Sequence, residues 1–182
     1  MKVVIFTTET SHHTFFIKKL SQVLKNIEVI CEIPQNLKFK FKTHHEFEKK
    51  REEYEKKYCF NNKPEKIEDF VNVNKFKSIN SYDAYRHIKK LNKSIFIVFG
   101  TRIIKKKIID LNKDLFFNLH GGDPLKYRGL DSHLWSIYNK DFDSLRTTIH
   151  KLDQGIDTGE IVDQEKLKFN SKSSLVNLRI IN

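Results

Sequence analysis

The sequence predicts an α/β fold in which an open, mostly parallel β-sheet carries helices on both faces. Short apolar runs recur along the chain, and stretches with a helical spacing of apolar residues separate them. The segment 94–99 is a continuous apolar run, which is typical of a parallel strand buried on both faces. A chain of 182 residues suits one domain, which buries roughly 70% of its unfolded surface and needs no disulfide or metal to fold.

The apolar runs give the strands in order. The run at the start, Val-Val-Ile-Phe-Thr, has the character of a buried strand, whereas the segment 146–151 alternates between apolar and polar residues, as a half-exposed strand does. The predicted strands cover 3–7, 28–33, 70–73, 94–99, 115–119 and 146–151, and a further strand begins at 160–162.

Helices are predicted where apolar residues recur every three or four positions, with a Ser, Thr or Asn placed to cap the first turn. The last of them carries Trp135, which we expect in the core. The predicted helices cover 14–24 (capped by Ser11 or Thr14), 82–92 (capped by Asn80 or Ser81) and 130–139.

Two segments depart from this pattern. The stretch 35–66 is rich in Lys, Glu and His with interleaved aromatics, and its part 43–58 predicts a helix. This basic helical insertion is either a solvated helix with one packed edge or a lid or docking arm for a substrate. The chain ends within a helical pattern that has no stop residue, so we expect that residues 1–182 form one catalytic domain with a truncated C-terminus.

Composition limits the compartment and the partners. No apolar run approaches ~18 residues, and the apolar run at the N-terminus is too short for a signal peptide, so a cytoplasmic protein without membrane contact is predicted. Cys31 and Cys59 lack metal-ligand spacing and are expected to be ordinary thiols, with no metal site. The net charge of +11 favours anionic partners, although only 6 of 34 basic residues are Arg, which is few for a sequence-specific nucleic-acid reader.

The polar residues around 118–120 suggest a site. All six glycines lie between positions 100 and 159, which points to chemistry in the second half of the chain. Asn118 and His120 stand two apart near the end of an apolar strand, so both project from one face at the edge where α/β sheets bind ligands. Asp157, between Gly155 and Gly159, is either a turn former or a carboxylate that meets His120 and raises its pKa.

These residues belong to a longer pattern. Asn-x-His is followed by Pro-x-x-Tyr-Arg-Gly, by a Trp-bearing helix, and by Thr-Ile-His-x-x-Asp-x-Gly-Ile-Asp-Thr-Gly-Glu-Ile. Over about 94–164 the chain resembles the formyltransferases that use 10-formyltetrahydrofolate. These include methionyl-tRNA formyltransferases, glycinamide ribonucleotide transformylases and sugar-nucleotide N-formyltransferases. The resemblance implies a Rossmann-like formyltransferase fold, and transfer of a formyl group from 10-formyltetrahydrofolate to a primary amine.

The resemblance also implies roles for residues. Asn118, His120 and Asp157 match the catalytic trio. In this role Asn118 and a protonated His120 stabilise the oxyanion, and Asp157 keeps His120 charged and helps to remove the proton of the amine. Two loops match those that bind the pterin of the donor, and they comprise Phe99, Gly100, Thr101, Arg102 and Ile103 on one side and Asp153, Gln154, Gly155 and Ile156 on the other.

The acceptor is less constrained. We expect acceptor contacts from Ser11, His12, His13, Asp123 and His133, although the first three also suit a polar turn that caps a helix. Gly-Gly-Asp-Pro stands where many members have Ser-Leu-Leu-Pro, so the acceptor side of the site departs from the family pattern. The favoured acceptor is a nucleotide-linked amino sugar. Charged tRNA, glycinamide ribonucleotide and hydrolysis of the donor are the alternatives, and a homodimer is an open option.

Overall fold

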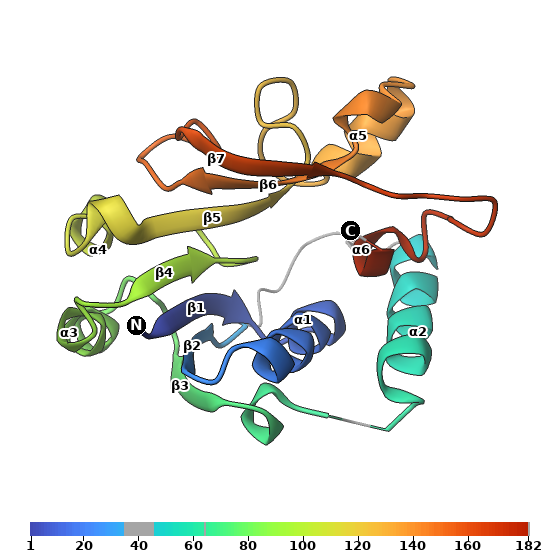
Figure 1. Cartoon of the computed structure of the whole chain (residues 1–182). Helices are drawn as coiled ribbons and strands as arrows, with labels where there is room; N and C mark the ends of the chain where they lie inside the picture. Colours follow the sequence, from blue (N-terminus) through green and yellow to red (C-terminus); the bar gives the residue numbers. More distant parts are fainter. Residues whose placement is uncertain (35–45, 64, 182) are drawn as a thin grey trace, which may run out of the picture.

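In the computed structural model the polypeptide forms one seven-stranded sheet in the order β3-β2-β1-β4-β5-β6-β7 (Figure 1). The structure describes residues 1–34, 46–63 and 65–181. The strands are β1 (Val3–Thr8), β2 (Ile27–Glu32), β3 (Asn72–Phe76), β4 (Ile95–Val98), β5 (Phe116–Gly121), β6 (Arg146–Lys151) and β7 (Ile161–Lys166). The helices are α1 (Ser11–Val23), α2 (Glu46–Phe60), α3 (Tyr82–Lys90), α4 (Lys106–Ile109), α5 (Ser132–Tyr138) and α6 (Leu178–Ile181).

The strand directions confirm the predicted α/β fold with a mostly parallel sheet. Strands β1 to β5 pair in parallel, and β6 and β7 then pair antiparallel at one end of the sheet. Strand β1 lies in the middle, with Val3 paired to Ile27 of β2 on one side and to Ile95 of β4 on the other. The strand order therefore reverses at β1 and β4, where the connections leave the sheet in opposite directions and a crevice opens at the carboxyl ends.

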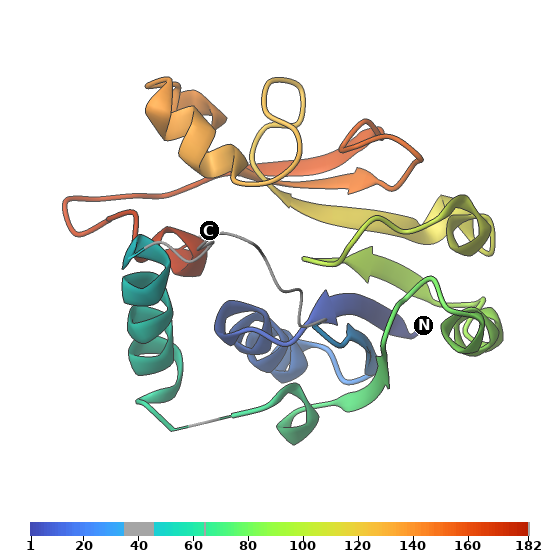
Figure 2. The ribbon, with the colours of Figure 1, turned by 180° about the vertical axis from the view of Figure 1, so that it is seen from behind.

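Alternate side chains of the central strands enter two separate apolar cores. Val4 and Phe6 of β1 pack with residues of α3 and α4, whereas Ile5 packs with Ile17 and its neighbours on α1. This alternation is the period of a strand that is buried on both faces. Figure 2 shows α1 and α3 on different sides of the strands. Helix α4 was not expected, because its four residues are too few to show a helical period.

The cap predicted from the sequence is confirmed for α3 and wrong for α1. Ser81 caps α3, since its hydroxyl accepts the N–H of Ala84, as predicted. For α1, neither Ser11 nor Thr14 is the cap. Thr10 occupies that position and its hydroxyl accepts the N–H of His13, so the helix begins earlier than the apolar spacing indicated.

Trp135 is not a core residue, and that expectation was wrong. Its side chain is 55% exposed and contacts Tyr138 edge to face on the outer side of α5. Helix α5 buries the opposite side, through Ser132, His133 and Ser136. Small and polar residues of α5 thus face the sheet. The spacing of apolar residues in this segment does not predict which side of the helix is buried.

Helix α2 covers much of the basic stretch predicted at 35–66, of which 35–45 and 64 lie outside the described residues. One edge of α2 is buried, through Arg51, Glu55 and Cys59. Glu55 accepts hydrogen bonds from Arg179 of α6, with a shortest distance of 2.7 Å. An ion pair with a buried carboxylate therefore joins this helix to the far end of the sequence.

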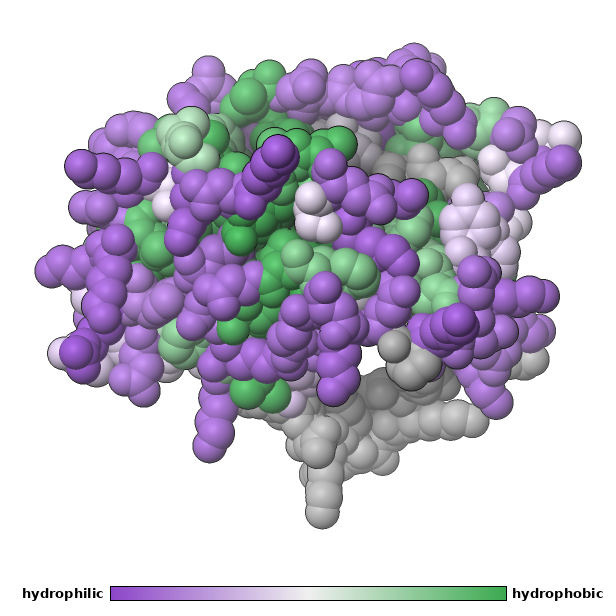
Figure 3. Space-filling view, turned by 60° about the horizontal axis from the view of Figure 1, so that its bottom comes forward, coloured by the Kyte–Doolittle hydropathy of each residue, from purple (hydrophilic) through white to green (hydrophobic). Residues whose placement is uncertain are grey.

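The surface reflects the basic composition. Hydrophilic side chains project over most of the face in Figure 3, with apolar patches between them. Among the described residues, no helix is both long enough and apolar enough to cross a bilayer.

Removing Phe116 tests the central core. Phe116 is fully buried and stacks on Phe96 with ring centroids 4.6 Å apart. We expect Phe116→Ala to lower the free energy of unfolding by about 3–5 kcal/mol, because a buried ring is replaced by a cavity. The half-exposed Trp135 provides the control, and Trp135→Ala is expected to cost at most about 1 kcal/mol. Urea denaturation measures both variants, and equal losses would contradict this division of core and surface.

Candidate active site

A large cavity lies at the carboxyl ends of the central strands. Its volume is about 1380 Å³, above the roughly 300–1,000 Å³ of a typical small-molecule pocket, so two ligands can share it. Its walls come from the ends of β1, β2, β4 and β5, from the loops at 99–105 and 152–157, and from α2 and α6. The cavity therefore lies at the crevice that the sheet topology creates.

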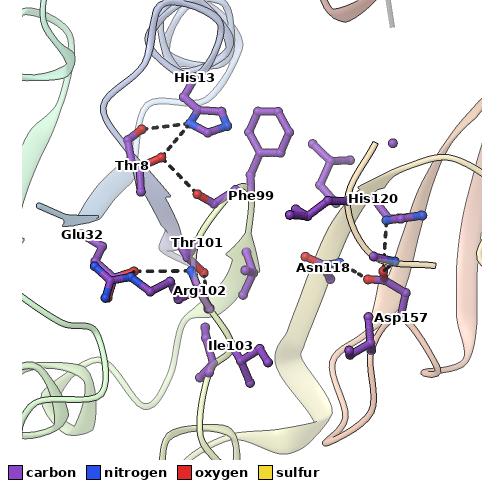
Figure 4. A pocket seen from close by; sticks show the side chains of 18 of the residues that line it. Thr8, His13, Glu32, Phe99, Thr101, Arg102, Ile103, Asn118, His120 and Asp157 are labelled. Atoms are coloured by element: carbon purple, nitrogen blue, oxygen red, sulfur yellow. Dashed lines mark hydrogen bonds and ion pairs between the residues drawn. The ribbon is translucent and has the colours of Figure 1, made fainter. Parts of the chain in front are cut away.

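Asn118 and His120 project into this cavity from β5, as expected of residues two apart in a strand (Figure 4). Both reach Asp157, which comes from the loop between β6 and β7. The Asn118 amide Nδ2 donates to Asp157 Oδ1 at 3.0 Å, and His120 Nδ1 lies 3.4 Å from Asp157 Oδ2. The three residues that the sequence pattern singled out thus meet at one carboxylate.

The backbone of Asp157 has a left-handed conformation with φ of 51°, which Asp tolerates better than most residues. Its Oδ2 also accepts the N–H of Gly129 at 2.7 Å. Burial alone would raise the pKa of Asp157. The hydrogen bonds from His150 and Gly129 and the charges of His120 and His150 outweigh burial and lower that pKa below its usual value. Asp157 is therefore an ionised carboxylate at neutral pH.

His150 is a fourth member of this group that was not predicted. It lies on β6 directly opposite Asn118 and is 1% exposed. Its Nε2 is 3.1 Å from Asn118 Nδ2 and 3.3 Å from Asp157 Oδ1, and its Nδ1 donates to the carbonyl oxygen of Lys151 at 2.9 Å. Because Nδ1 carries a proton, Nε2 of the neutral ring is free to accept the N–H of Asn118.

The charge of Asp157 also acts on His150. Burial disfavours the protonated imidazole, but the hydrogen bond to Asp157, the bond to the Lys151 carbonyl and the charges of Asp157 and Asp153 raise its pKa above the usual value. His150 was present in the sequence pattern as the His of Thr-Ile-His. Only the antiparallel pairing of β5 with β6 places it beside Asn118.

The loop that carries Asp157 is braced from within. The Thr158 hydroxyl lies 2.8 Å from both carboxylate oxygens of Asp153, and the N–H of Gly155 donates to the same carboxylate. Of the four donor-binding residues predicted on this loop, Asp153, Gly155 and Ile156 line the cavity. The fourth, Gln154, is not among the described residues that form the cavity wall.

The facing wall is the loop of residues 99–105 after β4, which we call the β4 loop. All five donor-binding residues predicted on it, from Phe99 to Ile103, line the cavity. Gly100 has φ of 73°, and a side chain there would overlap the imidazole of His13. The Thr8 hydroxyl donates to the carbonyl oxygen of Gly100 at 3.1 Å. Glycine is thus required where the loop turns away from the strand.

The residues predicted to contact the acceptor divide into two groups. His12, His13 and His133 line the cavity, whereas Ser11 and Asp123 do not appear among the described residues that form its wall. The Asp123 carboxylate instead accepts the N–H of Leu125 and shapes the turn after β5.

The three histidines are held neutral, mainly by burial. Burial lowers the pKa of His12 to about 2 and that of His13 to about 4, and it also lowers the pKa of His133. His13 Nδ1 lies 3.0 Å from the carbonyl oxygen of Thr8, and His133 Nε2 lies 2.7 Å from that of Arg146. At neutral pH these rings contribute hydrogen bonds to the cavity wall and carry no charge.

A family model described as formyl transferase matches residues 1–179. The chain belongs to this formyl transferase family. Members of the family are enzymes that transfer formyl groups, and they take the group from 10-formyltetrahydrofolate.

Curated relatives in this family match only part of their length. Methionyl-tRNA formyltransferase from Finegoldia magna is 32% identical over 103 residues, which are 56% of this chain and 33% of the relative. Bifunctional polymyxin resistance protein ArnA from Wigglesworthia glossinidia brevipalpis is 31% identical over 99 residues, which are 54% of this chain and 15% of the relative. The matches thus span a third or less of these relatives.

Solved structures confirm the formyltransferase fold. The crystal structure of phosphoribosylglycinamide formyltransferase from Bacillus halodurans superposes with a TM-score of 0.61 and 16% identity, covering 99% of this chain and 86% of that one.

The pairing of His150 with Asp157 predicts a pH-dependent stability. We expect the loss of unfolding free energy in His150→Gln to be largest below pH 6.5 and to shrink as pH rises through the raised pKa of His150. Below pH 6.5 His150 is protonated in both the folded and the unfolded chain, but only the folded chain stabilises the charge, through Asp157. At high pH His150 is neutral in both states, so this stabilisation is lost. Asp157 is ionised throughout this range because its pKa is lowered.

Urea denaturation of wild type and variant between pH 5.5 and 9 measures this difference. The same comparison in an Asp157→Asn background is the control, and there the pH dependence is expected to be much smaller, because the largest cause of the raised pKa of His150 is removed. A difference that grows with pH in the wild-type background would contradict the assigned pairing.

Proposed function

We propose that this chain transfers the formyl group of 10-formyltetrahydrofolate to a primary amine. The observation that carries the proposal is the meeting of Asn118, His120 and one ionised carboxylate, Asp157, in a single large cavity. The donor supplies a formyl carbon whose carbonyl oxygen becomes negative when an amine attacks it. The chain needs to stabilise that oxygen, to hold the two reactants and to move a proton.

Asn118 is suited to stabilise the oxygen, because its amide donates hydrogen bonds without carrying charge. Both of its N–H groups face partners in the ligand-free protein, Asp157 Oδ1 and His150 Nε2. Protonation of His150 at Nε2 converts that acceptor into a donor and releases one N–H of Asn118. Despite burial, the pKa of His150 is raised, mainly by its hydrogen bond to Asp157. In this scheme a protonated His150 leaves one N–H of Asn118 available to a developing negative charge.

His120 and Asp157 are suited to the proton transfer. The attacking amine loses one proton and the nitrogen that releases the formyl group gains one, so no net proton is consumed. The imidazole of His120 can exchange a proton with the reacting groups, and the ionised Asp157 lies 3.4 Å from its Nδ1. His120 Nε2 lies 3.0 Å from the carbonyl oxygen of Tyr127, which fixes the orientation of the ring.

The cavity has room for the donor between the β4 loop and the loop that carries Asp157. Ile103 and Ile156 are 73% and 58% exposed and flank this space with apolar surface. An aromatic ligand removes such surface from water, which favours binding. The residues present thus fit a folate, with backbone polar groups on one wall and apolar side chains beside them.

For the acceptor we propose a small anionic amine, with a nucleotide-linked amino sugar as the first choice. The cavity continues beyond the trio to Arg51 of α2 and Arg179 of α6, whose guanidinium groups suit phosphate oxygens. Each already faces a carboxylate, Glu48 and Glu55 respectively, so the site is polar and not uniformly cationic. The relatives named methionyl-tRNA formyltransferase favour charged tRNA as a second candidate.

Substitutions in the trio test the reaction. We expect Asn118→Ala to lower kcat by about 10²–10³, the usual loss for one oxyanion donor, and His120→Ala and Asp157→Asn to lower it at least as much. Each variant should still bind a formylfolate analogue and show the rise in Tm that a ligand of the folded state produces. His87→Asn, on α3 outside the cavity wall, is the control. Near-wild-type turnover in either His120→Ala or Asp157→Asn would overturn the assignment.

The acceptor is tested with 10-formyltetrahydrofolate and one amine at a time. We expect formylation of a nucleotide-linked amino sugar, measured by mass spectrometry, and little formylation of charged initiator tRNA at physiological salt. The reverse result would show that the acceptor class is wrong and would leave the trio unaffected. Release of formate without any amine would identify a hydrolase.

A further inference from the structure

The β4 loop is tied to neighbouring strand ends by two side chains that the proposed reaction does not use. These are Asn80, in the turn before α3, and Glu32, at the end of β2. Both line the cavity beside the loop. Because the loop forms one wall of the space proposed for the donor, whatever fixes its backbone also fixes the shape of that space.

Asn80 pairs with the β4 loop much as a neighbouring strand would. Its Nδ2 donates to the carbonyl oxygen of Ile103 at 2.9 Å, and its Oδ1 accepts the N–H of Lys105 at 2.8 Å. The N–H of Asn80 in turn donates to the hydroxyl of Ser78 at 3.2 Å, which steadies the turn. The Asn80 amide thus binds two backbone groups of the loop, one through its nitrogen and one through its oxygen.

Glu32 holds the residue just before this pair. Its carboxylate is 2% exposed, and Oε2 accepts the N–H of Arg102 at 3.4 Å and lies 3.5 Å from Arg102 Nε (Figure 4). The other oxygen, Oε1, accepts the N–H of Ile79 at 3.3 Å. Glu32 therefore connects the β4 loop to the same turn that carries Asn80. A buried carboxylate needs such donors, since an unpaired one would be strongly disfavoured.

These anchors engage only part of the loop backbone. Gly100, Arg102, Ile103 and Lys105 each have one backbone group held by Thr8, Glu32 or Asn80. Within the described residues, the N–H groups of Thr101 and Ile103 have no hydrogen-bond partner in the protein. Polar backbone groups at a cavity wall with fixed positions are what a planar, hydrogen-bonding ligand requires.

We infer that Asn80 and Glu32 are positioning residues that set the conformation of the β4 loop for the folate donor. The inference rests on the proposed function for the identity of the ligand. A loop held in its binding conformation pays less ordering entropy when the ligand arrives, so the effect falls on donor binding and not on the chemical step. Neither side chain needs to touch the reacting atoms.

The test compares Asn80→Ala with a matched control, Asn112→Ala. Asn112 Nδ2 also makes two bonds to backbone, 2.8 Å to the carbonyl oxygen of Asn92 and 3.2 Å to that of Ser94, just before β4 begins. The two variants thus remove similar interactions at opposite ends of one strand. We expect Asn80→Ala to raise the KM for the donor and the Kd of a formylfolate analogue roughly tenfold, with kcat within about twofold. Asn112→Ala should change neither.

Amide hydrogen exchange of the ligand-free proteins provides a second, independent measurement. Faster exchange at 101–105 in Asn80→Ala, and not in Asn112→Ala, is expected if the side chain holds the loop. Unchanged KM and Kd in Asn80→Ala would overturn the inference, as would a fall in kcat alone. If the wild-type protein bound no folate analogue, the proposed function would fail and the donor role with it, whatever the exchange rates showed.

Glu32→Gln is a second variant, chosen because it keeps the volume of a buried side chain. Its amide has one acceptor oxygen in place of two, so the N–H groups of Ile79 and Arg102 can no longer bind to separate oxygens. We expect donor binding to weaken less than in Asn80→Ala, again with kcat preserved. A Glu32→Gln variant with wild-type KM and wild-type exchange at 101–105 would remove Glu32 from the assignment.

Discussion

The carboxylate of Asp157 accepts an N–H from the amide of Asn118 and another from the backbone of Gly129, and it faces the rings of His120 and His150. These partners come from β5, from the turn after it and from β6, so one ionised group holds three segments in a fixed relation. A carboxylate with several N–H donors stays charged even when half-buried. The loop conformation follows from this arrangement. Asp157 adopts a left-handed backbone, and a side chain at position 159 would overlap the Lys151 carbonyl, so only glycine fits there.

The sheet topology explains why these groups meet a cavity. Because β1 lies between β2 and β4, the connections on either side of it leave toward different faces, and a crevice opens between them at the carboxyl ends. The β4 loop and the Asp157 loop then form the two walls. The first is fixed by the side chains of Glu32 and Asn80, which are distant in the sequence, and the second by its own Asp153–Thr158 contact. A rigid framework thus presents two short loops, one held by tertiary contacts and one by a contact within the loop.

Much of the fold could be predicted because strand burial leaves a clear pattern. The apolar run at 94–99 and the alternation at 146–151 correspond to β4 and β6, and the polar pair on β5 marked the carboxyl edge of the sheet. The rest depends on contacts between distant residues. His150 joins the site only through the antiparallel register that pairs it with Asn118, and Trp135 is exposed because α5 turns its small residues inward. Asn80 was expected only as a cap, since its bonds to the β4 loop follow from tertiary structure.

The central position of β1 has a consequence for how the chain acquires this structure. Its partner on one side, β2, follows after a single helix, but its other partner, β4, begins at residue 95. A nascent chain therefore carries an apolar strand with one unpaired edge until β4, at residues 95–98, has been made. Such an edge is a template for association with other chains, and long-range parallel pairing forms slowly. At synthesis rates of about 5–20 residues per second, this interval lasts several seconds, during which the edge of β1 that faces β4 stays open to other chains.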